Sequence, residues 1–237
     1  MIAIGENKAT IYKGDFHPAA LYKGDKKIAG YNVEEFEGEN GITLENSYND
    51  KLHNVQIEGV TEATITARGK NLFDMTKHTV SQGYYNDSTG TINSSNAKLI
   101  RISPIAIKPS TRYTISISSK LYLYTIWFHY GSHESNGISK ILTGNVCKVT
   151  FTTPENCNYI CVSMYSNSTA KPEDLEWVML EKGAGDGIFE PFTEPQTILF
   201  KDSELEGEIP TFKGTTVIEI EADAPAKIRG KYKRKEE

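Results

Sequence analysis

Aromatic and polar residues alternate along three predicted strands in a pattern that could bind a sugar. Successive side chains of a strand point to opposite faces. The residues of segment 125–130 expected to face the core are Ile126, Phe128 and Tyr130. Those expected on the opposite face are Thr125, Trp127 and His129, joined by Arg101 and Tyr165 from two further strands. Aromatic rings stack on the apolar faces of sugars while polar neighbours hold the hydroxyls, so Trp127, His129, Tyr165 and Arg101 form the candidate glycan-binding face.

A packing role for Trp127 is the alternative to this binding role. The ring would then lie beneath a loop or against the flanking segments of the chain. Buried aromatic residues are commoner than aromatic ligand platforms, which favours the packing interpretation.

Residues of catalytic types are present, but their spacing matches no catalytic motif. The five histidines are scattered along the chain, at His17, His53, His78, His129 and His133. No HExxH, Gly-x-Ser-x-Gly or phosphate-loop pattern occurs, and the glycines of 183–187 lack a strand-to-helix context, which indicates a flexible turn. Adjacent acids such as Glu34–Glu35 and Glu173–Asp174 are interpreted as solvated. We therefore expect no enzymatic activity.

The charge of the chain argues against nucleic-acid binding. The net charge is −5, whereas a phosphate-binding surface carries clustered Lys and Arg. The exception is the basic run from Lys227 to Lys235, which we interpret as a solvated tail in preference to a binding patch.

The chain shows no pattern of a secreted, membrane-spanning or disulfide-linked protein. Its start, Met1 to Glu6, lacks the basic flank and apolar run of a signal peptide, and no stretch of about twenty apolar residues occurs. The odd cysteine count, with Cys147, Cys157 and Cys161, predicts reduced and mostly buried thiols. We expect the protein to stay in the cytoplasm where it is made, or to leave by cell lysis, as virions do.

The elements that must position these residues are strands. Residues 1–67 carry a repeat, Ile11–Asp15 and Leu21–Asp25, typical of a hairpin or meander that is too small to be stable alone. Residues 68–196 contain short alternating strands separated by turns, which predicts a jelly-roll β-sandwich. Residues 197–237 form a small strand-rich segment in which 228–232 is expected to pair with 215–221. The fold class predicted is all-β, a central jelly roll flanked by small strand-rich segments.

The middle segment contains an ordered set of motifs. They are Lys-Asn-Leu-Phe-Asp (70–74), Pro-Ser-Thr-Arg-Tyr-Thr-Ile-Ser (109–116), Ile-Trp-Phe-His-Tyr (126–130), Phe-Thr-Thr-Pro (151–154), Met-Leu-Glu-Lys-Gly (179–183) and Phe-Glu-Pro-Phe (189–192). This order resembles the carbohydrate-binding-module-like jelly rolls of tail, fibre and baseplate proteins from phages and prophages of Firmicutes. The set covers about half the chain, and its closing motifs are the most specific.

The resemblance implies a structural protein of a phage tail or baseplate, located in the virion. The partners it implies are other tail proteins, further copies of this chain in a homo-oligomer (a trimer by analogy) and host-wall polysaccharide. Family jelly rolls often hold a structural calcium, for which Asp74 and Glu181 are the candidate ligands; no other cofactor is implied. The alternatives are a free carbohydrate-binding module or adhesin of a bacterial surface protein and, less favoured by the motifs, a wall-degrading hydrolase.

Overall fold

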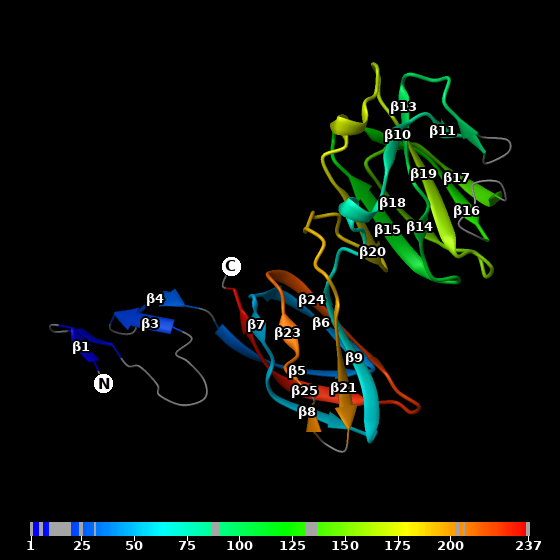
Figure 1. Cartoon of the computed structure of the whole chain (residues 1–237). Coiled ribbons are helices and arrows are strands. Elements are labelled where there is room, and N and C mark those ends of the chain that lie inside the picture. The colour runs from blue at the N-terminus through cyan, green and yellow to red at the C-terminus, as the bar shows by residue number, and fades with distance from the viewer. Residues whose placement is uncertain are drawn as a thin grey trace. The chain divides into compact units, whose positions relative to one another are not determined.

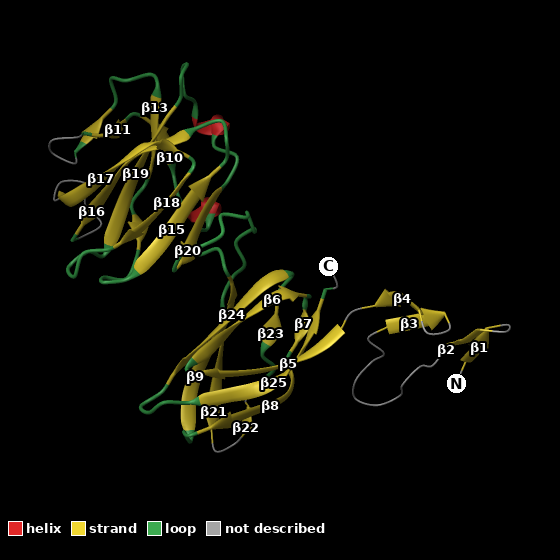
Figure 2. Cartoon of the chain, turned by 180° about the vertical axis from the view of Figure 1, so that it is seen from behind, coloured by secondary structure: helices red, strands yellow, loops and turns green. Residues whose placement is uncertain are grey.

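The protein is an all-β chain that divides into two compact units. The computed structural model describes residues 2–4, 7–9, 20–23, 26–30, 32–86, 91–130, 137–201, 204–205 and 207–235. Within these ranges the only helical elements are two 3₁₀ turns, η1 (Met75–Lys77) and η2 (Pro172–Asp174), and no helix is long and apolar enough to span a membrane (Figure 2). Unit 1 comprises residues 1–69 and 193–237, and unit 2 comprises residues 70–192. The predicted all-β class is confirmed.

The N-terminal part of unit 1 contains two antiparallel hairpins. One joins β1 (Ile2–Ile4) to β2 (Asn7–Ala9), and the other joins β3 (Ala20–Lys23) to β4 (Lys26–Gly30). The first copy of the repeat, Ile11–Asp15, lies outside the described residues. Of the second copy, Leu21–Lys23 belongs to β3, while Gly24 and Asp25 lie outside the described residues.

An eight-stranded sheet and a separate two-stranded ladder form the body of unit 1, and each combines strands from both ends of the chain. The first part contributes β5 (Asn32–Glu39), β6 (Gly41–Ser47), β7 (Asp50–Lys51), β8 (His53–Glu58) and β9 (Glu62–Gly69). The last part contributes β21 (Gln196–Lys201), β22 (Glu204–Leu205), β23 (Pro210–Thr211), β24 (Gly214–Glu221) and β25 (Lys227–Arg234). The order is β22-β21-β9-β24-β6-β25-β5, with β8 also paired to β25 and with β7 and β23 forming a separate ladder (Figure 1; β22 is labelled in Figure 2).

This arrangement differs from the three-segment prediction. The two flanking segments form one unit because β24 pairs with β9 on one edge and with β6 on the other. Strand β25 consequently pairs with β5, and not with β24 as the sequence suggested. The shared core includes Leu44, Ile65, Phe200, Ile218 and Ile228. Interleaving gives the two segments a common interior, which shares apolar residues from both.

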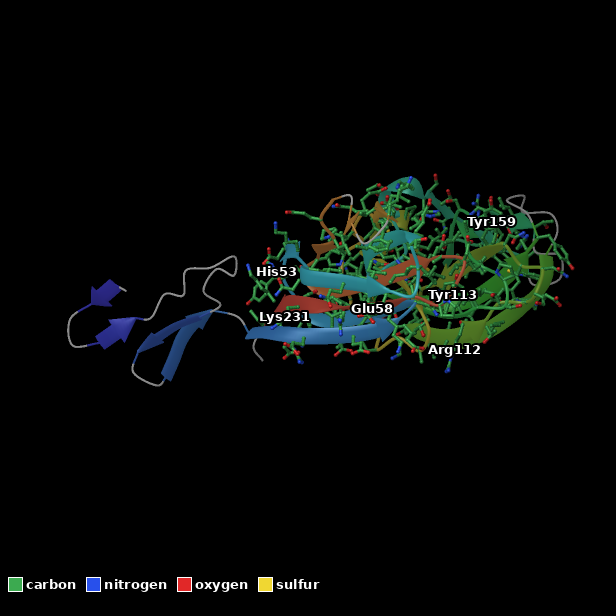
Figure 3. All side chains as sticks on the ribbon, turned by 90° about the horizontal axis from the view of Figure 1, so that it is seen from below. His53, Glu58, Arg112, Tyr113, Tyr159 and Lys231 are labelled. Carbon is green, nitrogen blue, oxygen red and sulfur yellow. The ribbon has the colours of Figure 1, made fainter. Side chains whose placement is uncertain are left out.

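The basic run of the C-terminus is a strand that pairs with an acidic strand. Opposite charges face each other across β25 and β5, with Lys231 Nζ 2.9 Å from Glu35 Oε1 and Arg234 Nη1 3.0 Å from Glu34 Oε2. On the other edge of β25, Arg229 Nη2 lies 2.7 Å from Glu58 Oε1 of β8; Lys231 and Glu58 are labelled in Figure 3. The predicted tail is therefore wrong for Lys227–Arg234, because these residues form a strand of the sheet. Their basic side chains remain partly exposed, as predicted, and are paired with neighbouring carboxylates.

Unit 2 is a β-sandwich built from two antiparallel sheets and a separate hairpin of β11 and β12. Its strands are β10 (Val80–Gln82), β11 (Tyr84–Tyr85), β12 (Ile92–Asn93), β13 (Leu99–Ile102), β14 (Ile105–Ala106), β15 (Arg112–Ile117), β16 (Tyr122–His129), β17 (Gly137–Val146), β18 (Lys148–Thr152), β19 (Tyr159–Tyr165) and β20 (Val178–Lys182). One sheet has the order β10-β13-β19-β16-β17, with β14 also paired to β19, and the other has the order β18-β15-β20. Their facing side chains, among them Ile115, Ile126 and Val162, form one buried core.

Asn71 fastens the beginning of unit 2 to its end. Its Nδ2 donates to the carbonyl oxygens of Val178 (3.2 Å) and Glu190 (3.0 Å). Its Oδ1 accepts from the backbone amides of Phe73 (2.9 Å) and Leu180 (3.1 Å). The side chain is buried, so these four bonds satisfy its polar atoms away from water. The opening and closing motifs of the middle segment therefore meet at this residue.

Reversing the charge of Glu35 is expected to destabilise unit 1. Hydrogen bonding and charge from Lys231 hold the pKa of Glu35 below its usual value, so the pair stabilises the fold above the ordinary carboxyl pKa and loses this effect as the pH falls through the lowered value. Glu35→Lys should lower the thermal midpoint of unit 1 by a few degrees at neutral pH and low salt, measured by calorimetry. The double variant Glu35→Lys/Lys231→Glu should restore it.

Asp223→Lys, at an exposed position in the same unit, is the matched control for that charge change. An equal loss in the Asp223 and Glu35 variants would contradict a specific role for the cross-strand pair.

Replacing Asn71 by Ala is expected to destabilise unit 2 by about 2–4 kcal/mol, because it removes four bonds and leaves buried backbone groups without partners. Both tryptophans lie in unit 2, so urea unfolding followed by tryptophan fluorescence reports on this unit. Asn158→Ala removes a single exposed bond to the Tyr130 carbonyl and should cost less than about 1 kcal/mol. Equally small changes in the two variants would refute the role assigned to Asn71.

Candidate functional site

The second face of the six-stranded sheet carries three of the four residues predicted to bind a glycan. Ile126 and Phe128 face the core, and Thr125, Trp127 and His129 lie on the opposite face, as the alternation predicts. Tyr130, predicted to be core, is 51% exposed because β16 ends at His129.

Trp127, His129 and Arg101 gather around Tyr85, a residue that the sequence analysis did not select. The ring of His129 lies edge-on to Trp127 and to Tyr85, with centroid distances of 6.4 Å in both cases. The guanidinium of Arg101 lies 5.9 Å from the centre of the Tyr85 ring. These contacts join residues of β11, β13 and β16 into one layer.

Tyr165 lies apart from this group. Trp127 faces Cys161 across the ladder between β16 and β19, whereas Tyr165 faces Tyr122 at the other end. Four residues of extended strand separate the levels of Cys161 and Tyr165, which is about 13 Å. The structure therefore does not bring Tyr165 beside Trp127.

The hairpin of β11 and β12 covers the Trp127 face. Trp127 is 6% exposed and His129 is 0% exposed, and Tyr85 and Ile92 of the hairpin pack on Trp127 and Cys161. The Tyr85 hydroxyl donates to the Ile102 carbonyl (2.8 Å), and the Tyr85 amide donates to Ser163 Oγ (2.9 Å), which fastens the cover. Trp127 thus packs beneath a hairpin, and sugar stacking on its ring requires the hairpin to move.

A local signal for this cover exists in the sequence. Tyr84 and Tyr85 precede the turn residues 86–90 and Ile92 follows them, a pattern of apolar residues about a turn that predicts a hairpin. The signal does not say which face of which sheet the hairpin would cover.

A second cluster surrounds Lys70, where the opening and closing motifs meet. Its Nζ lies 3.0 Å from Asp186 Oδ1, 3.4 Å from Glu190 Oε1 and 3.9 Å from Glu181 Oε1. Burial raises the pKa of Glu181, and the charge of Lys70 opposes this effect. The pKa of Lys70 is raised because the three carboxylates outweigh the opposing effect of its own burial.

The glycine-rich segment 183–187 packs directly on Glu181. A Cβ placed on Gly185 would lie only 2.1 Å from Glu181 Oε2, so no larger residue fits without a shift. The Gly185 amide is further held by Thr114 Oγ1 at 2.9 Å, and Asp186 pairs with Lys70. This segment, predicted to be a flexible turn, is held by specific contacts that close it over a buried carboxylate.

Asp74 and Glu181, the predicted calcium ligands, have separate partners. Asp74 Oδ1 accepts from the Thr76 amide (3.0 Å) and hydroxyl (2.7 Å), and its Oδ2 lies 3.3 Å from Lys77 Nζ. Glu181 belongs to the Lys70 cluster. Across the described residues, no group of three or more His, Cys, Asp or Glu side chains is placed to hold a metal ion. In both cases a lysine neutralises charge that a calcium ion would otherwise offset.

Trp127→Ala is expected to lower the free energy of unfolding of unit 2 by about 3–5 kcal/mol, because it opens a cavity beneath the hairpin. The matched control is Trp177→Ala: the Trp177 ring is half-buried and stacks on the exposed Phe189 at 4.7 Å, and its loss should cost about 1–2 kcal/mol. Urea unfolding followed by circular dichroism measures both. A Trp127 variant as stable as the Trp177 variant would show that the hairpin does not seal this face.

Trp127→Phe keeps an aromatic ring in the layer and separates packing from binding. If the indole stacks on a sugar, this variant should bind wall polysaccharide more weakly while remaining folded. Unchanged binding would exclude the indole as a sugar platform.

Comparison with known proteins assigns no family. No protein-family model and no curated protein matches the chain. Among solved structures, that of infectious bursal disease virus Gt strain aligns with a TM-score of 0.19 and 8% identity, over 86% of this chain and 79% of that chain. The structure of the Gx strain aligns with a TM-score of 0.17 and 10% identity, over 96% of this chain and 45% of that chain. Likeness at this level carries no argument about fold or function.

Proposed function

We propose that this protein is a non-enzymatic structural component of a phage tail or baseplate, in which unit 2 is a sandwich module inserted into unit 1. The observation that carries the proposal is the role of the motif residues on which the resemblance rests. Asn71 of the opening motif bonds to backbone around the closing motifs, and Lys70 pairs with Glu181 and Glu190 of those motifs. These motif residues hold the two ends of unit 2 together. Such a structural role fits a protein that serves as a building block of a tail.

The environment of the polar residues supports a non-catalytic role. Glu181, whose pKa is raised, lies beneath Gly185 with no room for a substrate atom between them. His129 is fully buried within an aromatic layer. A general acid or base must come within about 3 Å of the group it protonates, and neither residue offers that access.

The N-terminal hairpins support assembly with other subunits. Each consists of two short strands, and an isolated hairpin is marginally stable in water. Packing against a neighbouring copy or another tail protein would stabilise them. Closed symmetric homo-oligomers are the commonest assemblies, and a trimer is our proposal for this chain.

A host-glycan-binding role for unit 2 is the extension of this proposal. It is supported by the aromatic and polar composition of the layer around Tyr85, and it requires the β11–β12 hairpin to open. The second candidate function, a free carbohydrate-binding module or adhesin, depends on the same layer without the tail assembly.

The proposal predicts that the chain is a constituent of assembled particles. Antibodies raised against the purified protein should label the tail or its tip in electron micrographs of virions from a host that carries this gene. In light scattering, the purified full chain should have the mass of three copies of the 26.4-kDa polypeptide, and removal of residues 1–31 should yield the monomer.

Virions that lack the chain would refute the tail assignment, with antibodies against a known tail protein as the control for labelling. A monomeric full chain at tens of micromolar would refute the trimer. The labelling of virions would then decide whether the protein belongs to the tail.

A further inference from the structure

Unit 2 contains a polar surface cavity that is open to solvent, in a region unrelated to the Trp127 face or the Lys70 cluster. Its volume is about 330 Å³, near the lower end of the range for small-molecule sites, which suits one small unit such as a single sugar. The lining residues come from the turn between β15 and β16, the loop after β19 and the turn η2. They are Lys120, Ser166, Ser168, Thr169, Lys171 and Asp174.

Backbone contacts hold the walls of this cavity in place. The loop after β19 is tied to the segment before β13 by the amides of Ser166 and Ala170, which donate to the carbonyls of Lys98 (3.0 Å) and Ala97 (2.9 Å). Turn η2 is closed by Asp174, whose Oδ2 accepts from the Lys171 amide at 2.8 Å. Ser118 Oγ accepts from the Glu176 amide at 3.1 Å and links the β15–β16 turn to the chain after η2. These bonds fix the backbone of the walls, while the exposed side chains of Lys171 and Ser168 become ordered only when a ligand binds.

The chemistry of the lining suits a ligand with both hydroxyls and a negative charge. Three hydroxyl side chains, of Ser166, Ser168 and Thr169, each donate and accept hydrogen bonds. The lining holds two lysines and one aspartate, but Lys120 is paired with Glu176 beside the cavity, so these four groups carry no net charge and Lys171 is the lysine left to bind an anion. No apolar side chain belongs to the lining. Glu176 lies 2.6 Å from Lys120 Nζ and raises the pKa of Lys120, which keeps the ammonium charged at neutral pH.

We infer that this cavity binds a small polyhydroxylated anion, namely a sugar or polyol unit that carries a phosphate or a carboxylate. Lys171 pairs with the anionic group, and the serine and threonine hydroxyls bind those of the ligand. An anion without hydroxyls would contact only the lysine, and a neutral polyol would contact only the serine and threonine hydroxyls. This inference does not rest on the proposed tail function, because it is argued from the lining residues alone.

Calorimetric titration of the full-length chain tests the site with defined probes. Glycerol 3-phosphate and glucuronate represent the phosphate and carboxylate forms; glycerol, glucose and inorganic phosphate represent the separate parts. At least one of the two anionic polyols should bind saturably at one site per chain, more tightly than the three partial probes. Whichever binds identifies the acidic group that the site accepts.

Two variants of the cavity and one control locate the binding. Lys171→Glu should weaken binding by at least about tenfold, because a charged hydrogen bond is replaced by repulsion. Ser168→Ala should weaken it by a few fold. Lys108→Glu makes the same charge change at an exposed loop position of unit 2 and should leave affinity unchanged; thermal unfolding verifies that all three variants fold.

Three results would overturn the inference. The first is the absence of saturable binding by both anionic polyols. The second is inorganic phosphate that binds as tightly as they do, which would indicate a nonspecific anion site. The third is an equal loss of affinity in the Lys171 and Lys108 variants, which would indicate attraction to the overall surface charge.

Discussion

The structure depends first on the position of β24 between β9 and β6. Backbone hydrogen bonds hold a strand from the end of the chain between two strands from its beginning, and a side-chain contact of 2.8 Å between Ser47 and Thr216 reinforces the junction with β6. Because β9 ends at Gly69 and β21 begins at Gln196 beside it, the chain between them must leave unit 1 and return to it. Unit 2 therefore has to close on itself, and Asn71 and Lys70 join its two ends.

Burial on both sides of the large sheet of unit 2 explains the environment of Trp127. One face packs against β15, β18 and β20, and the hairpin of Tyr85 and Ile92 covers the part of the other face around Trp127 and Cys161. A sheet covered on both faces excludes water from side chains that would be exposed on an open sheet. The aromatic and polar mixture in this layer is thus compatible with a packed interior, where Tyr85 uses its hydroxyl to bond to backbone.

Charge in this protein is largely compensated locally. The basic strand β25 faces the acids of β5 and β8, and Lys70 faces three carboxylates. Such pairs limit the long-range field of the surface, which leaves little of the general attraction for polyanions that the basic run would otherwise have produced. The cavity lined by Lys120 and Lys171 follows the same pattern, because Lys120 pairs with Glu176, and the anion proposed for this cavity would pair with Lys171.

The sequence by itself determined the all-β class, the sandwich in the middle of the chain and the two faces of β16. These follow from period-two alternation, in which Ile126 and Phe128 separate from Thr125, Trp127 and His129 through local backbone geometry alone. Only the tertiary structure decided that the flanks form one unit, that the basic run pairs with Glu34 and Glu35, that Tyr85 covers Trp127 and that Tyr165 lies away from it. Each of these depends on register and contact between residues far apart in the chain, such as Arg234 and Glu34, which no local pattern encodes.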